Sequence, residues 1–272
     1  MKTLPNRQKS RRILHAMWAV VGILLCATLL SAIICYGTIR VTNYSLPLSG
    51  VTTPVRGTMI ADTHGREFGE NNSRLIQKIQ DTHPDVIFLV GDMVDREDSQ
   101  KEVDGVLQLI RSLQAVAPVY FAPGNHEMDY LKKDPTLLDQ VAAAGAAVVN
   151  DSFVDVTIHG QPLRIGGTMG HGFPFGRTWE EFAASPEYVF LKEFEDTDSP
   201  TLCLAHRPDT FIFNDAQKYW NVDLVLSGHT HGGLIRIPGI GGLVAPMQGF
   251  FPKYDRGYFR LGQHIQIGRA HV

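Results

Sequence analysis

Residues 86–95 read VIFLVGDMVD, and this stretch decides the fold class. Its five apolar residues, Val86 to Val90, are bounded by a glycine, which is typical of a short strand buried in a sheet. Gly91 and Asp92 follow at once, so a carboxylate stands where the strand ends. The glycine alone is also explained by an ordinary turn. The stretch therefore predicts a buried strand that places Asp92 at the edge of a sheet.

Similar apolar runs continue on both sides of this stretch. Further strands are expected at residues 58–61, 119–122, 147–150, 202–205, 224–226, 234–237 and 257–261, with a β-hairpin from 153–158 and 163–166. Helices are expected at residues 73–81, 101–114, 136–144 and 178–184. Short apolar strands that alternate with helices indicate an α/β fold.

Polar residues that can bind metals close five of the expected strands. In chain order these clusters are Asp62-Thr63-His64, Gly91-Asp92-Met93-Val94-Asp95, Gly124-Asn125-His126-Glu127, Ala205-His206-Arg207 and Gly228-His229-Thr230-His231. One such cluster is weak support for a site, because a lone histidine is more often a satisfied polar residue than a ligand. Sites in α/β sheets gather at the carboxyl ends of the strands. The five clusters are therefore expected to converge in space.

The five clusters together resemble the motifs of the calcineurin-like metallophosphoesterase family. The resemblance covers residues 57–260 and is greatest to a bacterial subgroup of membrane-associated or exported proteins. It implies an α/β fold, a four-layer α/β/β/α sandwich of the metallo-dependent phosphatase type, and a site for two metal ions. The formal net charge is only -3, so the overall charge of the protein does not favour nucleic acid as a binding partner.

The family's ligand roles, placed on the matching residues, define two metal sites that share Asp92 as a bridge. Asp62, His64 and His231 complete one site, and Asn125, His206 and His229 complete the other. Carboxylate, amide and imidazole ligands without a thiolate suit two divalent transition-metal ions, with manganese, iron, zinc and cobalt all open. Two such ions activate a bridging hydroxide that attacks phosphorus.

Four further residues receive hypotheses. The resemblance implies that His126 is the catalytic acid for the leaving group. Asp95 and Glu127 are expected to orient metal-binding histidines, although for each of them a solvated loop position is the alternative. Arg207 follows a predicted ligand and suits a phosphate oxygen, or else packs on the surface against Pro208.

The N-terminus predicts a membrane anchor. Residues 1–12 contain five Lys or Arg residues and no acid, and the apolar run that follows predicts a transmembrane helix at 13–39. Basic residues before the run predict that residues 1–12 stay in the cytoplasm and that the catalytic domain lies outside it. A cleaved export signal and a twin-arginine signal remain alternatives. None of the three cysteines is expected to form a disulfide.

The expected organisation is a linker at 40–54, a metallophosphoesterase domain at 55–266, and a tail at 267–272 that we interpret as non-native, with the domain shortened at its C-terminus. The expected activity is hydrolysis of phosphodiesters, with lipid headgroups or envelope polymers as substrates at the cell membrane. The alternatives are a phosphomonoesterase or nucleotide hydrolase with the same metal site, and an inactive membrane-anchored binding protein. The sequence leaves the oligomeric state open.

Overall fold

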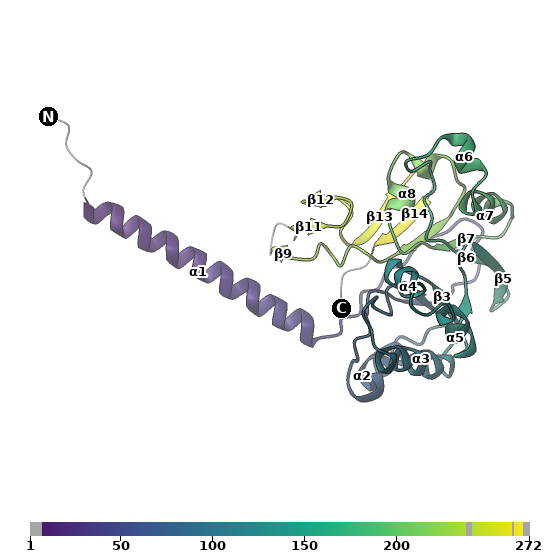
Figure 1. Cartoon of the computed structure of the whole chain (residues 1–272), viewed down its shortest axis with the longest axis horizontal. Helices are drawn as coiled ribbons and strands as arrows, with labels where there is room; N and C mark the ends of the chain where they lie inside the picture. Colours follow the sequence, from purple (N-terminus) through teal and green to yellow (C-terminus); the bar gives the residue numbers. More distant parts are fainter. Residues whose placement is uncertain (1–6, 238–240, 263, 269–272) are drawn as a thin grey trace.

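The structure, a computed structural model, describes residues 7–237, 241–262 and 264–268. Its body consists of two large β-sheets packed face to face, with helices on the outer side of each (Figure 1). The first sheet has four parallel strands in the order β1-β2-β3-β4. These strands span Gly57–Ile60, Val86–Val90, Val119–Ala122 and Ala147–Val148.

The second sheet has six strands in the order β13-β14-β8-β7-β6-β5. Its four inner strands are parallel, and the two outer strands run antiparallel to their neighbours. In chain order the strands are β5 (Ser152–Ile158), β6 (Gln161–Gly167), β7 (Thr201–Leu204), β8 (Leu224–Ser227), β13 (Gly257–Leu261) and β14 (His264–Gly268). The hairpin expected from residues 153–166 is formed by β5 and β6.

Helices form the two outer layers. Those that contribute to the apolar cores are α2 (Ser73–Gln80), α3 (Gln100–Gln114) and α5 (Leu137–Ala143) on the first sheet, and α6 (Trp179–Ala183), α7 (Pro186–Glu195) and α8 (Asp209–Ile212) on the second. The remaining short helices are η1 (Glu70–Asn72), α4 (Asn125–Tyr130) and η2 (Ala216–Lys218). The predicted four-layer α/β/β/α sandwich is confirmed.

Strand β2 shows how the sequence specifies these layers. Ile87 and Leu89 pack in the core under the first helical layer, whereas Phe88 and Val90 pack in the core between the sheets. Because successive side chains of a strand point to opposite faces, a strand covered on both sides must be apolar throughout. Each fully buried side chain of this kind stabilises the fold by about 1.5–3 kcal/mol, so the uninterrupted VIFLV run holds three of the four layers together.

Helices α4 and α7 and strand β14 are among the elements that were not predicted from the sequence. Helix α7 begins where the Ser185 hydroxyl accepts from Tyr188 N at 3.4 Å, and Pro186 occupies its first turn. Helix α4 begins at Asn125, inside one of the polar clusters. Strand β14 lies between β13 and β8, and the expected domain boundary at residue 266 falls inside it. The expected non-native tail stays a prediction, and its last four residues, 269–272, lie outside the described part of the chain.

The N-terminal helix α1, Arg7–Gly37, projects away from the body (Figure 1). Its 21-residue stretch Ser10–Leu30 is apolar enough to cross a membrane and is not buried against the rest of the protein. At 1.5 Å per residue this stretch is about 31 Å long, close to the roughly 30 Å of a hydrocarbon core. Length and composition therefore permit a membrane span, as predicted.

Two small antiparallel pairs follow β8. Strand β9 (Arg236–Ile237) pairs with β10 (Gly241–Gly242), and β11 (Val244–Ala245) pairs with β12 (Gly249–Phe250). They stand apart from the two large sheets, on the side of the body from which α1 projects (Figure 1).

Candidate metal centre

The predicted ligands follow the carboxyl ends of strands in both sheets, six of them on loops and Asn125 at the first position of α4. Five of the seven have a left-handed backbone, with φ of 57° at Asp62, 48° at His64, 51° at Asp92, 67° at His229 and 48° at His231. A residue other than glycine in this region costs about 1–3 kcal/mol and persists only where the surrounding structure enforces it. Such strain concentrates at functional sites, so the backbone itself marks these loops.

Three glycines allow the loops to approach one another. A Cβ atom at Gly91 would lie 2.6 Å from Gly124 Cα and 2.6 Å from His206 Nδ1. A Cβ at Gly124 would collide with the Asp92 carboxylate, and one at Gly228 would lie 2.8 Å from Asp62 Oδ2. Any side chain at these three positions would keep the loops apart. The glycines are therefore needed for the close approach of the loops and not only for turns.

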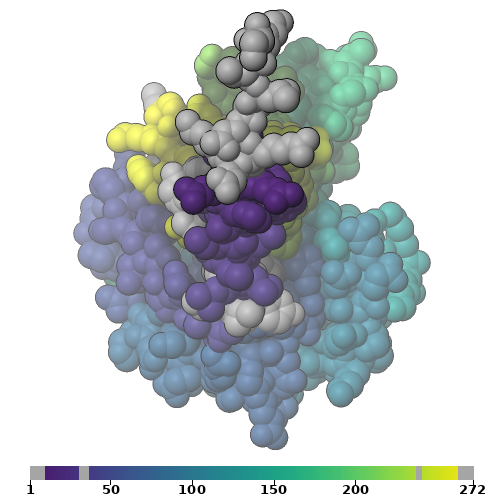
Figure 2. Space-filling view, turned by 90° about the vertical axis from the view of Figure 1, so that its left-hand side faces the viewer, coloured from purple at the N-terminus to yellow at the C-terminus, as the bar shows by residue number. Residues whose placement is uncertain are grey.

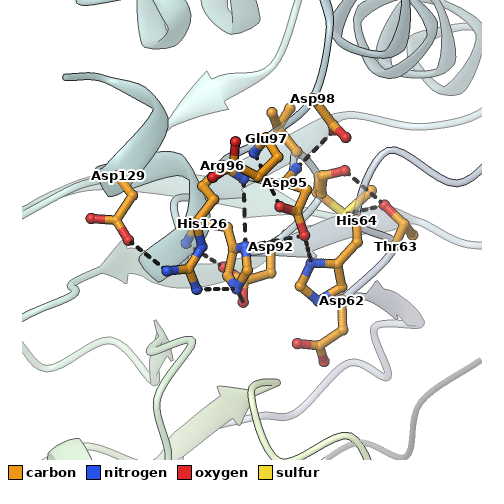
Figure 3. A network of polar contacts seen from close by, with 12 residues as sticks. Asp62, Thr63, His64, Asp92, Asp95, Arg96, Glu97, Asp98, His126 and Asp129 are labelled. Atoms are coloured by element: carbon orange, nitrogen blue, oxygen red, sulfur yellow. Dashed lines mark hydrogen bonds and ion pairs between the residues drawn. The ribbon is translucent and has the colours of Figure 1, made fainter. Parts of the chain in front are cut away.

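One group of possible ligand atoms comes from Asp62, His64 and His231, all within 4.8 Å of one another. Nδ1 of His64 lies 3.1 Å from Asp95 Oδ2 in a hydrogen bond, and its Nε2 is buried with no hydrogen-bond partner (Figure 3). Asp95 thus orients this histidine, as predicted, with Nε2 as its free ring atom. Asp62 accepts from His229 N at 2.9 Å through Oδ1, while its Oδ2 also has no hydrogen-bond partner.

A second group comes from Asp92, His206 and His229. His206 Nδ1 donates to the carbonyl of Val90 at 2.8 Å, and its Nε2 faces Asp92 Oδ2 at 3.0 Å. Burial, with the neighbouring His206, lowers the pKa of His229 to about 4, which keeps its ring in the neutral form that binds metals. Asn125 lies next to His126 in the chain, and the backbone N–H of His126 donates to Asp92 Oδ1 at 2.8 Å.

The side chains fit a pair of cations. Among the described residues, seven buried side-chain atoms have no hydrogen-bond partner, and five of them belong to predicted ligands: Asp62 Oδ2, His64 Nε2, Asp92 Oδ2, Asn125 Oδ1 and His206 Nε2. The other two belong to His171 and Gln217. Two of the five ligand atoms, Asp92 Oδ2 and His206 Nε2, lie 3.0 Å apart as an ion pair. Buried polar atoms are normally hydrogen-bonded, so the concentration of such potential ligand atoms in one cluster indicates metal ligation.

The charge of the cluster leads to the same conclusion. Burial lowers the pKa of His206, but the carboxylates of Asp92 and Asp62 outweigh it and raise that pKa to about 9. The two buried carboxylates therefore favour positive charge beside them, which divalent ions supply more strongly than a proton does.

Glu127 does not orient a histidine, contrary to the prediction, and it is not a solvated loop residue. It is fully buried and accepts four backbone N–H groups, from Asp92 and Gly124 at 2.8 Å each through Oε2, and from Met93 at 2.7 Å and Val94 at 2.9 Å through Oε1. Burial, with the charge of Asp92, raises the pKa of Glu127 to about 7, while the four donors stabilise its ionised form. Glu127 therefore fixes the loop that presents Asp92.

His126 lies beside the cluster, mostly buried. Its Nε2 is 4.0 Å from Asp92 Oδ2 and 3.2 Å from the guanidinium of Arg96, and its Nδ1 is 3.2 Å from Asp95 Oδ2 (Figure 3). His64, Asp95 and His126 also form a third group of close donor atoms. Arg96 was missed in the sequence because it follows the motif rather than belonging to it, and Figure 3 shows it between Asp129 and His126.

Arg207 does not pack on the surface. Its guanidinium donates to Asp209 Oδ2 at 2.7 Å, and Nε2 of His171 lies 3.4 Å from the same oxygen. Burial raises the pKa of Asp209, but His171 and Arg207 outweigh it and lower that pKa to about 2. Both Arg207 and Asp209 act electrostatically on His229, so this group borders the second ligand group. The Gly170-His171-Gly172 loop that supplies His171 gave no motif to recognise.

Comparison with known proteins finds phosphoesterases among the proteins that this chain resembles. An uncharacterized metallophosphoesterase of Campylobacter jejuni is 26% identical over 241 residues, which is 84% of this chain and 56% of that protein. The phosphodiesterase YaeI of Escherichia coli is 26% identical over 189 residues, 69% of this chain and 63% of that protein. The chain thus spans little more than half the length of such relatives.

The crystal structure of TT1561 of Thermus thermophilus is 17% identical to the chain, with a TM-score of 0.49, and covers 80% of this chain and 90% of its own. The model of the calcineurin-like phosphoesterase family matches residues 56–233, which include every predicted ligand. This match covers more than half of the chain, and the chain therefore belongs to the calcineurin-like phosphoesterase family.

Proposed function

We propose that the protein is a metal-dependent phosphodiesterase anchored in a membrane. Metal dependence is supported by five buried side-chain N or O atoms of predicted ligands that have no hydrogen-bond partner. Asp62, His64 and His231, with Asp92, would hold one ion, and Asn125, His206 and His229, with Asp92, would hold the other. Two bound ions lower the pKa of a water molecule and neutralise phosphoryl charge.

The chain's own residues then have separate tasks. Asp92 accepts from His126 N through Oδ1 and faces His206 through Oδ2, so its carboxylate is held in the cluster where it would bind both ions. Asp95 and the Val90 carbonyl accept from Nδ1 of His64 and of His206, which orients both rings and would leave each Nε2 for an ion. His126 lies close enough to the cluster to give a proton to the leaving alkoxide, and the nearby Arg96 guanidinium suits an anionic phosphoryl group.

Phosphodiesters are favoured as substrates because the Escherichia coli relative is named a phosphodiesterase. Lipid headgroups or envelope polymers are favoured among diesters because α1, with its basic N-terminal flank, would hold the domain at the outer face of the cell membrane. The same ligand set also serves a phosphomonoesterase or nucleotide hydrolase, so the ester class must be measured.

The test combines metal analysis with an ester panel on the full-length protein. We expect two divalent ions per chain and faster hydrolysis of a nitrophenyl diester than of a nitrophenyl monoester. Asp92→Asn should lower the content of both ions, because the shared carboxylate loses its charge, whereas His64→Ala should mainly lower one. At most one ion in folded wild-type protein would reject the dinuclear proposal, and a preference for the monoester would favour the alternative activity.

Topology requires its own measurement. A C-terminal reporter that is active only outside the cytoplasm should give a signal on the full chain. Activity of a cytoplasm-only reporter at the same position would contradict the proposed orientation.

A further inference from the structure

A cluster of exposed apolar side chains lies in and next to the small strand pairs that follow β8. We call it the apolar tip, and it consists of Leu234, Ile235, Met247, Phe250 and Phe251. Phe250 and Phe251 are 74% and 63% exposed, so this phenylalanine pair does not belong to the core. Exposed apolar residues that gather in one place mark a surface that contacts a partner or a membrane.

The apolar tip is held by its own backbone. Val244 pairs with Phe250 in the β11–β12 hairpin, and Phe251 N donates to Leu243 O at 2.8 Å. Leu243 N in turn donates to Ile235 O at 2.7 Å, which connects this hairpin to the segment before β9. The exposed phenyl rings are thus presented by a hydrogen-bonded support, so their exposure is not that of a loose loop.

The position of the apolar tip singles out one partner. β9, β11 and β12 project on the same side of the body as α1 (Figure 1), and the view from that side shows late residues, in yellow, next to the helix (Figure 2). The linker that follows α1 runs close to the start of β13, a few residues after the apolar tip, because Tyr44 Oη would lie 3.9 Å from a Cβ at Gly257. A bilayer crossed by α1 would therefore lie on the side that carries the apolar tip.

The charge around the apolar tip fits a lipid surface. Residues 232–256, which precede β13, contain three basic residues, Arg236, Lys253 and Arg256, and one acidic residue, Asp255, which pairs with Arg236, although the whole chain has a net charge of -3. Lys253 and Arg256 are exposed. Aromatic side chains flanked by cations are the composition of segments that lie in the interface of anionic membranes.

We propose that the apolar tip inserts into the outer interface of the same bilayer that α1 crosses, as a second and shallow membrane contact. Its occupant is lipid, with Phe250 and Phe251 among the acyl chains and the neighbouring cations at the headgroups. The contact would fix the rotation of the catalytic domain about its tether. This inference rests on the membrane location given above under Proposed function and is independent of the reaction that the metal centre performs.

The test uses the full chain with Cys26→Ala and Cys35→Ala, reconstituted into phosphatidylcholine vesicles that contain phosphatidylglycerol. Cys203 is fully buried and is left in place. An environment-sensitive dye is attached at Phe250→Cys, and in a second protein at Phe251→Cys. The matched control is Trp179→Cys, because Trp179 is a 50% exposed aromatic residue on α6, far from α1 (Figure 1). Quenching by lipids with spin-labelled acyl chains is then measured.

Segments of this kind are buried by about 5–10 Å, so we expect quenching at positions 250 and 251 to exceed that at 179 at least about threefold. Equal quenching at all three positions would overturn the proposal. A dye at 250 that is shielded from water but not quenched by the lipids would also overturn it, because protein would then cover the apolar tip. Neither outcome depends on enzymatic activity, so a failure here is separate from a failure of the proposed reaction.

Discussion

Replacing Glu127 by glutamine tests whether one buried carboxylate builds the metal centre without touching a metal. Each carboxylate oxygen of Glu127 accepts two backbone N–H groups, and together these four donors fix the loops that carry Asp92 and Asn125. Glutamine keeps the shape but has one carbonyl oxygen. Its NH₂ group would face two of the four donors.

The magnitude follows from the number of donors left without an acceptor. Each buried N–H that loses its partner costs about 1–3 kcal/mol, so Glu127→Gln should lower the free energy of unfolding by roughly 2–6 kcal/mol. Domains are typically stable by about 5–15 kcal/mol, so the variant should still fold in most of that range. Loss of a residue that orients ligands lowers metal affinity about 10- to 100-fold, and a similar loss is expected here.

Denaturant unfolding and metal titration of the full chain measure both effects. The matched control is Glu102→Gln, since Glu102 also accepts a backbone N–H, from Ser99 at 2.7 Å, but is exposed at the start of α3. The control should change stability far less and should leave metal affinity unchanged. If Glu127→Gln behaved like the control in both assays, the role assigned to Glu127 in shaping the Asp92 loop would be refuted.

Three other predictions follow from the site. His126→Ala should retain both ions and lose about 10²–10⁴-fold in activity on an alkyl ester, which needs a proton on its leaving group, but far less on a nitrophenyl ester; equal losses on both would exclude the acid role. Gly124→Ala should reduce metal content measured by elemental analysis, because its Cβ would collide with the Asp92 carboxylate, and unchanged content would contradict that packing. The pKa of Asp209 is lowered to about 2, so it should contribute about 2 kcal/mol of stability above pH 4 that is lost as the pH falls toward 2. Urea unfolding of metal-free protein should show this acid loss in the wild type but not in Asp209→Asn, and the same slope in both would contradict it.

The elements that the sequence predicted are those with a local cause. The run from Val86 to Val90 is apolar on both faces, and the polar residue at its end marks the edge of the sheet. The same pattern located the strands before Asp62, His206 and His229. Helix α7 had a comparable local signal, since Ser185-Pro186 is a strong helix start and Phe190 and Phe194 share one face. It was missed although its pattern was present.

The missed parts depend on residues far apart in the chain. Strand β14 is defined by its pairing with β8, about forty residues earlier. Glu127 belongs to a recognisable motif, but its four partners are backbone N–H groups, three of them on the loop after β2. Every residue type except proline carries such a group, so the sequence does not indicate which of them Glu127 binds. His171 meets Asp209 only because β6 and β7 are neighbours in the second sheet.

The way the ligands are shared between the sheets connects the fold to the proposed chemistry. One group joins Asp62 and His64, after β1, to His231, after β8, and the other joins Asp92, after β2, to His206 and His229, which follow β7 and β8. Each group thus takes side chains from both sheets, whose facing surfaces are otherwise held by the apolar core between them. An ion bound by either group would tie the two carboxyl edges together, and binding to the folded state alone adds stability that grows with ion concentration. Bound cations would then offset the free-energy cost of burying the carboxylates and of holding the loops in a left-handed conformation.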